Sequence, residues 1–103
     1  MKSTTYPIDL SAMQTALKEQ RQSIGKETLS HHYANEVRLI NNAVTGNSQC
    51  CYRDLPITRE LSRAIRQVVC QNIKLIRLHV AYQERKESCR DVFLKATSVL
   101  TQN

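Results

Sequence analysis

The sequence contains very little glycine, proline and phenylalanine and no tryptophan. Its 103 residues include two Gly, two Pro, one Phe and no Trp. So few turn-forming residues argue against collagen-like, low-complexity and turn-rich all-β chains. The two glycines, Gly25 and Gly46, lie too far apart to build the Gly-rich loops that hold phosphates in Walker and dinucleotide-binding motifs. These absences favour a mostly helical chain without a nucleotide-binding loop.

Long apolar runs are absent as well. The N-terminal residues 1–6 carry one Lys but are not followed by the apolar stretch of a secretory signal. Nowhere do ~18 apolar residues follow one another, as a membrane-spanning helix requires. We therefore expect an intracellular, cytoplasmic protein that does not bind membranes. At this length we expect one helical domain over residues 1–103, too short to hold a substrate domain beside a catalytic one.

The four cysteines lack the spacing of a zinc site. Cys50 and Cys51 are neighbours, whereas Cys70 and Cys89 stand alone, so no C-x-x-C pair occurs. Reduced thiols in a cytosolic protein are the simplest interpretation. A thiol enzyme that uses Cys50 or Cys51 is a minor alternative, because the turn that carries them holds no histidine to serve as a base.

The three histidines do not form a catalytic or metal-binding pattern. His31 and His32 are adjacent and would point about 100° apart on a helix. A zincin motif instead places its two histidines four residues apart, with Glu directly after the first, and Glu36 does not supply that arrangement. His79 is flanked by apolar residues, which favours a packed or interface histidine. We therefore predict no enzymatic activity, no cofactor and no metal site.

Two amphipathic helices are predicted in the first half of the chain. Apolar residues at spacings of three, four and seven predict a helix over about 10–24, which Gly25 should end. A second apolar series predicts a helix over about 28–45, which Gly46 should end. A loop over 46–56 is expected to follow.

The third helix is predicted to be much longer. From Ile57 onward the chain has no Gly or Pro, and its apolar residues keep a helical period. A helix is predicted over about 57–86, and its part from Thr58 to Lys86 alone would be about 43 Å long, whereas a compact domain of this size has a radius of gyration near ~13 Å. A final helix over about 89–100 is expected, with Ser88 and Asp91 as its capping pair. The alternative is that the long helix continues to the C-terminus.

The middle of this long helix is apolar on more than one face. One face can pack on the first two helices and the other needs a further partner, so we predict a homodimer or a higher oligomer. Asn72 would lie on the helix seam, where Asn sets the register of coiled-coil dimers. The fold class is all-α, with three to four helices, one long third helix and an oligomeric assembly. The predicted oligomer or partner stripe consists of Leu61, Ile65, Val68, Val69, Asn72, Ile73, Leu75, Ile76 and Val80.

Positive charge is concentrated on the same segment. The chain has a formal net charge of +6, and five cations face only Glu60 in the window 58–77. Their spacing, with Cys70 completing the row, places all five on one side of a helix. Arg suits planar contacts to carboxylates and phosphates. The predicted partner-binding row consists of Arg59, Arg63, Arg66, Lys74 and Arg77.

These features predict interaction with another macromolecule. The first hypothesis is a small intracellular regulator that binds and inhibits or redirects another protein with an acidic surface, such as a transcription regulator or a nucleic-acid enzyme, in an antirepressor-like role. The alternative is a helical dimer that binds duplex DNA directly through the basic row as a transcription regulator. A helix-turn-helix over 16–35 is not supported, because Arg21 occupies a position that needs a small residue and His31 one that needs an apolar residue.

Overall fold

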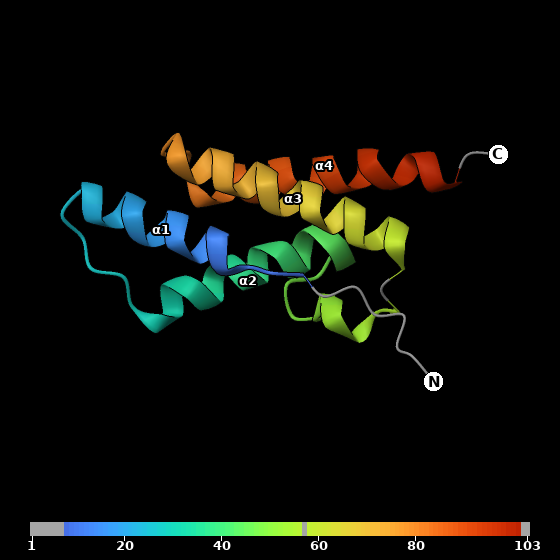
Figure 1. The fold of residues 1–103 in the computed structure, drawn as a ribbon, viewed down its shortest axis with the longest axis horizontal. Coiled ribbons are helices and arrows are strands. Elements are labelled where there is room, and N and C mark those ends of the chain that lie inside the picture. Colours follow the sequence, from blue (N-terminus) through green and yellow to red (C-terminus); the bar gives the residue numbers. More distant parts are fainter. Residues whose placement is uncertain (1–7, 57, 102–103) are drawn as a thin grey trace.

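The computed structural model describes residues 8–56 and 58–101, and these residues are mostly helical. They form α1 (Ser11–Ser23), α2 (Ser30–Thr45), the short 3-10 helix η1 (Tyr52–Asp54), α3 (Arg59–Arg77) and α4 (Tyr82–Thr101), with no strand among them (Figure 1). The all-α prediction is confirmed. The first two helices lie within two residues of the predicted bounds at each end.

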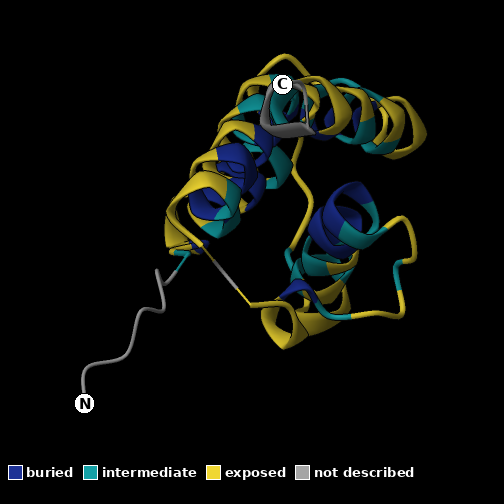
Figure 2. Cartoon of the chain, turned by 90° about the vertical axis from the view of Figure 1, so that its right-hand side faces the viewer, coloured by how far each residue is buried: buried dark blue, intermediate teal, exposed yellow. Residues whose placement is uncertain are grey.

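The helices run alternately up and down, with α1 packed on α3 and α2 on α4. Helices α3 and α4 share the most extensive contact, whereas α1 and α2 touch each other little. Figure 1 shows the α1–α2 and α3–α4 connections at the same end of the molecule, while α1 begins and α4 ends toward the other. Seen along the helices, the buried faces turn inward and the exposed faces turn outward (Figure 2).

Local sequence signals explain several helix ends. Helix α1 ends at Gly25, whose φ of 75° is left-handed, and the Lys26 N–H donates to the Arg21 carbonyl at 2.8 Å. This six-residue closure is a Schellman motif, which glycine favours because it has no Cβ to clash. Gly46, with a φ of 82°, ends α2 in the same left-handed conformation. The Thr58 hydroxyl accepts a backbone N–H and caps the first turn of α3.

The predicted long helix over 57–86 is wrong, because the chain turns back between α3 and α4. His79 adopts a left-handed backbone with a φ of 59°, which an α-helix cannot contain. The Val80 N–H donates to the Leu75 carbonyl at 3.0 Å, the same closure that ends α1 at Gly25. Histidine is tolerated here more readily than a β-branched residue, so the turn needs no glycine.

The last helix also starts earlier than predicted. Helix α4 begins at Tyr82, so both the start near residue 89 and the alternative of one helix to the C-terminus are wrong. Ser88, predicted to cap this helix, lies inside α4, where its hydroxyl accepts a hydrogen bond from Gln71 Nε2 of α3 at 3.1 Å. With 19 residues, α3 is about 28 Å long and fits within one compact domain.

The predicted oligomer stripe is used inside the single chain. Of its nine residues, Ile65, Val68, Val69, Asn72 and Ile76 are buried, and the other four are partly buried. They pack against α1, α2 and α4, so the second apolar face of α3 is covered by the fold itself. The sequence argument for self-association therefore loses its basis, because it required a face that only another copy could cover.

The predicted loop 46–56 contributes to the core through η1. Tyr52 is only 2% exposed, and its backbone N–H donates to Asn41 Oδ1 of α2 at 3.1 Å. The loop therefore covers one end of the hydrophobic core, the end near the first residues of α3.

A buried polar cluster joins three helices inside the bundle. Arg85 of α4 forms an ion pair with Glu36 of α2, and its Nη1 also donates to Asn72 Oδ1 of α3 at 3.0 Å. Asn72 Nδ2 in turn donates to Glu36 Oε1 at 2.9 Å. All three residues are at most 7% exposed. A buried charge is tolerated only with such partners, so this polar cluster fixes where α4 lies on α2 and α3.

The left-handed turn leads to a prediction about residue 79. His79→Gly and His79→Val both remove the imidazole, but only Val must place a branched Cβ in the left-handed conformation. We expect His79→Val to have a free energy of unfolding lower than His79→Gly by about 1 kcal/mol, measured by urea denaturation. Equal stabilities would mean that α3 does not end in this turn.

A second prediction concerns Cys89, which reports on the packing of α4 against α3. Its thiol is fully buried, faces the Val68 carbonyl at 3.8 Å, and burial raises its pKa to about 12. The thiolate is the reactive form, so at pH 8 we expect Cys89 to be alkylated roughly a thousandfold more slowly than an ordinary thiol. Cys50 and Cys70 are exposed and should react quickly in the same sample. Mass spectrometry of iodoacetamide-treated protein measures both, and a Cys89 that reacts as fast as Cys70 would contradict the α3–α4 packing.

Candidate functional site on α3

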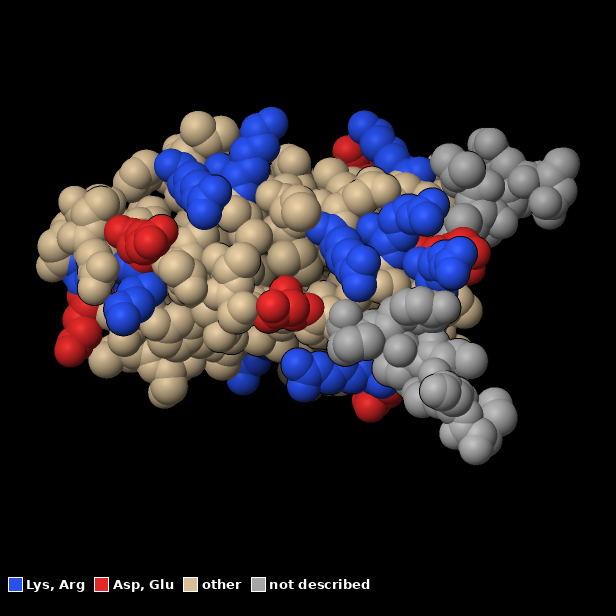
Figure 3. Space-filling view, viewed as in Figure 1, with Lys and Arg blue, Asp and Glu red and all other residues tan. Residues whose placement is uncertain are grey.

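The outer side of α3 carries the predicted basic row. All five side chains are exposed, on the side of the helix opposite the buried residues. From first to last the row spans 18 residues, or about 27 Å along the helix axis. Figure 3 shows Lys and Arg side chains in separate groups on this face of the molecule, with uncharged surface between the groups and acidic side chains beside some of them. We name these residues the basic ridge: Arg59, Arg63, Arg66, Lys74 and Arg77.

The basic ridge is not neutralised by the protein itself. Within the described residues, none of its five side chains forms an ion pair or a side-chain hydrogen bond; the two ion pairs found there join Arg85 to Glu36 and Lys95 to Asp91. Glu60 is the single acid of α3, which leaves this helix with a net charge of +4. A row of solvated cations at this density attracts an acidic surface or a phosphate backbone.

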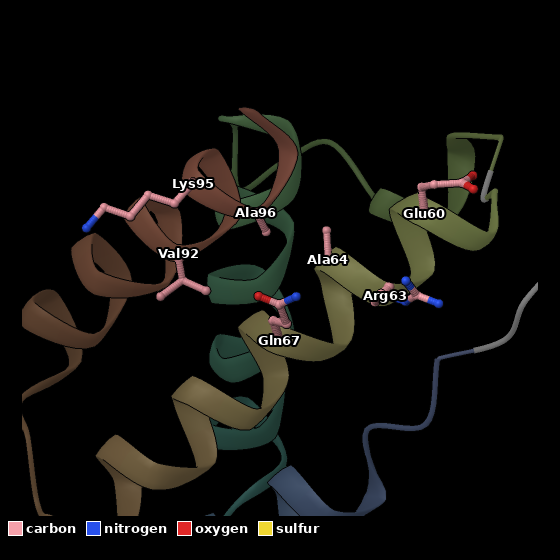
Figure 4. A pocket seen from close by; sticks show the side chains of 7 residues that line it. All are labelled: Glu60, Arg63, Ala64, Gln67, Val92, Lys95 and Ala96. Carbon is pink, nitrogen blue, oxygen red and sulfur yellow. The ribbon is translucent and has the colours of Figure 1, made fainter. Parts of the chain in front are cut away.

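A groove between α3 and α4 adjoins the basic ridge. It has a volume of about 560 Å³, and its apolar floor is formed by Ala64, Val92 and Ala96. In Figure 4 the two alanines lie between the helices, whereas Arg63 and Lys95 extend away from the groove on its two sides. Small side chains on both helices leave the space open. The remaining lining residues are Glu60 and Gln67.

The groove was not predicted from the sequence, because it depends on the hairpin that α3 and α4 form. Val92 and Ala96 fall on the apolar side of the predicted last helix, but nothing in that pattern places them opposite Ala64. Arg63 is the one residue shared by the predicted basic row and the groove. Lys95, on the other rim, forms an exposed ion pair with Asp91 at 3.2 Å.

The described histidines and cysteines do not form a catalytic group or a metal site. His32 Nδ1 accepts the Leu29 N–H at 3.0 Å at the start of α2, and its ring lies 4.0 Å from that of His31. All four thiols are free, with Cys70 on the ridge face of α3. Among the described residues, no group of three His, Cys, Asp or Glu side chains could hold a metal ion.

Comparison with known proteins gives no match that indicates a function. No family model matches the chain, and no curated protein or solved structure matches it either. In the part of the chain that the structure describes, no helix has both the length and the apolar character needed to cross a membrane.

Proposed function

We propose that this protein is a small regulatory interaction protein that binds an acidic partner protein through the basic ridge and the adjoining groove. The observation that carries the proposal is a row of five exposed, unpaired cations beside an apolar groove. The biological role that fits is antirepressor-like: by covering an acidic surface of a transcription regulator or a nucleic-acid enzyme, the protein would inhibit or redirect it. No enzymatic activity or cofactor is needed for this role.

The groove favours a protein partner over a nucleic acid. Protein interfaces combine an apolar centre, where anchor side chains lose contact with water, with a polar rim. The apolar centre would be formed by Ala64, Val92 and Ala96. The polar rim would be formed by Arg63 and Lys95. A phosphate backbone has no apolar side chain to place on such a floor. Cations on the ridge would then steer the encounter, so the association rate should fall as salt rises.

The occupant that fits is an acidic amphipathic helix. Its apolar side would enter the groove between α3 and α4, and its carboxylates would face the basic ridge, which is the helix-in-groove mode of recognition.

Direct binding of duplex DNA remains the second candidate, supported by the same unpaired arginines. Five phosphate contacts would make the affinity fall steeply with salt. This candidate uses the basic ridge but not the groove, so the two functions can be separated by one substitution in the groove.

The test is a titration with two probes: a synthetic 18-residue helical peptide with Glu on one face and Leu and Ala on the other, and a 20-base-pair duplex. We expect the peptide to bind the wild-type protein at low salt, and Arg63→Glu with Arg66→Glu to weaken it by about tenfold or more. Lys18→Glu with Arg38→Glu, which changes the charge equally at exposed positions on α1 and α2, should have little effect.

Ala96→Phe distinguishes the two candidates, because it fills the groove without changing the charge. We expect it to abolish peptide binding while the melting temperature and helical circular dichroism stay near wild type. A wild-type protein that binds the duplex and not the peptide, or an Ala96→Phe variant that binds the peptide normally, would overturn the proposed function.

A further inference from the structure

A second cavity lies at the end of the bundle where the α1–α2 connection meets the α3–α4 turn. It has a volume of about 480 Å³, and its lining comes from all four α-helices and from both connections, with Ile76 as the residue of α3. It shares no lining residue with the groove beside the basic ridge. Its volume is within the roughly 300–1,000 Å³ typical of small-molecule sites. The charged and titratable residues of its lining are Arg21, Lys26, His32, Glu36, His79, Tyr82 and Arg85.

The lining of this cavity is electropositive. Three cations face a single acid, Glu36, which is already paired with Arg85. Lys26 is exposed and has no ion-pair partner among the described residues. Arg21 makes only a backbone contact, from its Nε to the Glu27 carbonyl at 3.0 Å. The pKa of His32 is lowered, first by burial and then by the positive charges of Arg21 and His31.

Arg85 is a buried residue of this lining, and hydrogen bonds hold its guanidinium in place. Its Nε donates to the Val80 carbonyl at 3.1 Å, its Nη1 to Asn72 and Glu36, and its Nη2 to Glu36 Oε2 at 3.1 Å. A guanidinium has five N–H groups, so these contacts leave one N–H on Nη2 without a partner among the described residues. Because four contacts hold the group, that donor loses little entropy when it binds a ligand.

The imidazoles of His32 and His79 also line the cavity and can each donate a hydrogen bond to an anion. His79 Nδ1 lies 3.0 Å from Gln20 Nε2, and both side chains line the cavity. The amide nitrogen of Gln20 is a donor, so His79 Nδ1 accepts and the other ring nitrogen carries the proton.

We propose that this cavity binds a small molecule that carries a dianionic oxygen group, such as a phosphate monoester or a dicarboxylate. Arg and Lys recognise both groups through the same charge-assisted hydrogen bonds. Lys26 and Arg21 supply the charge that attracts the ligand, and Arg85 supplies the buried donor. This site is independent of the proposed protein-binding surface, because it uses other residues at another part of the chain.

The experiment uses inorganic phosphate, glycerol 3-phosphate and succinate as separate probes, with sodium chloride holding the ionic strength constant. We expect one class of probe to raise the melting temperature and to shift the ring resonances of His32 and His79 in NMR spectra. If the phosphates do so and succinate does not, the ligand is a phosphate monoester; the reverse outcome makes it a dicarboxylate. No shift with any probe, or an equal shift with sodium chloride alone, would overturn the proposal.

The variants test the residues of the site. Arg21→Gln with Lys26→Gln removes two charges from the lining while Arg85 and its buried contacts remain, so the protein should fold normally. We expect at least a tenfold loss of affinity for the active probe. Lys18→Gln with Arg38→Gln is the matched control and should bind as wild type. Equal loss in both double variants would show a general charge effect and would also overturn the proposal, whereas Arg63→Glu with Arg66→Glu should leave this binding intact.

Discussion

The ion pair between Glu36 and Arg85, completed by Asn72, is the interaction on which the rest of the structure depends. Burying an isolated charge would cost several kcal/mol, so each member must meet its partners in the folded state. They come from α2, α3 and α4, and they meet only if α4 folds back along α3. The left-handed turn at His79 makes that return possible. Because the polar cluster has one satisfied arrangement, it selects this packing over one continuous helix.

The functional surfaces follow from this hairpin. When α4 and α1 cover the apolar sides of α3, the side that remains exposed is the one that carries the basic ridge. The alanines at the α3–α4 contact leave a groove beside it, and the two helix connections enclose a second cavity at the end of the bundle. A chain of 103 residues thus presents two separate hollows, both bordered by cations; we propose that one receives a protein helix and the other a small anion.

The sequence predicts those features that depend on local chemistry. Gly25 and Gly46 terminate α1 and α2, and the 3.6-residue period places the five cations on one exposed side. The end of α3 at His79 was not predicted, because a histidine in the left-handed conformation gives no sequence signal comparable to Gly or Pro. That single error lengthened the third helix, shifted the start of the last one, and turned core residues into a predicted oligomer surface. The groove and the second cavity could not be predicted, since residues far apart in the chain line both of them.

The measurement that tests this account most directly is a double-mutant cycle on the buried ion pair. Glu36→Gln, Arg85→Met and the combined variant would be compared with wild type by urea denaturation. Each single change leaves a buried polar group unpaired and should cost about 3–5 kcal/mol, and the double variant should cost less than the sum by about 2 kcal/mol. Additive effects within about 0.5 kcal/mol would show that the two side chains do not meet and would contradict the folded-back position of α4.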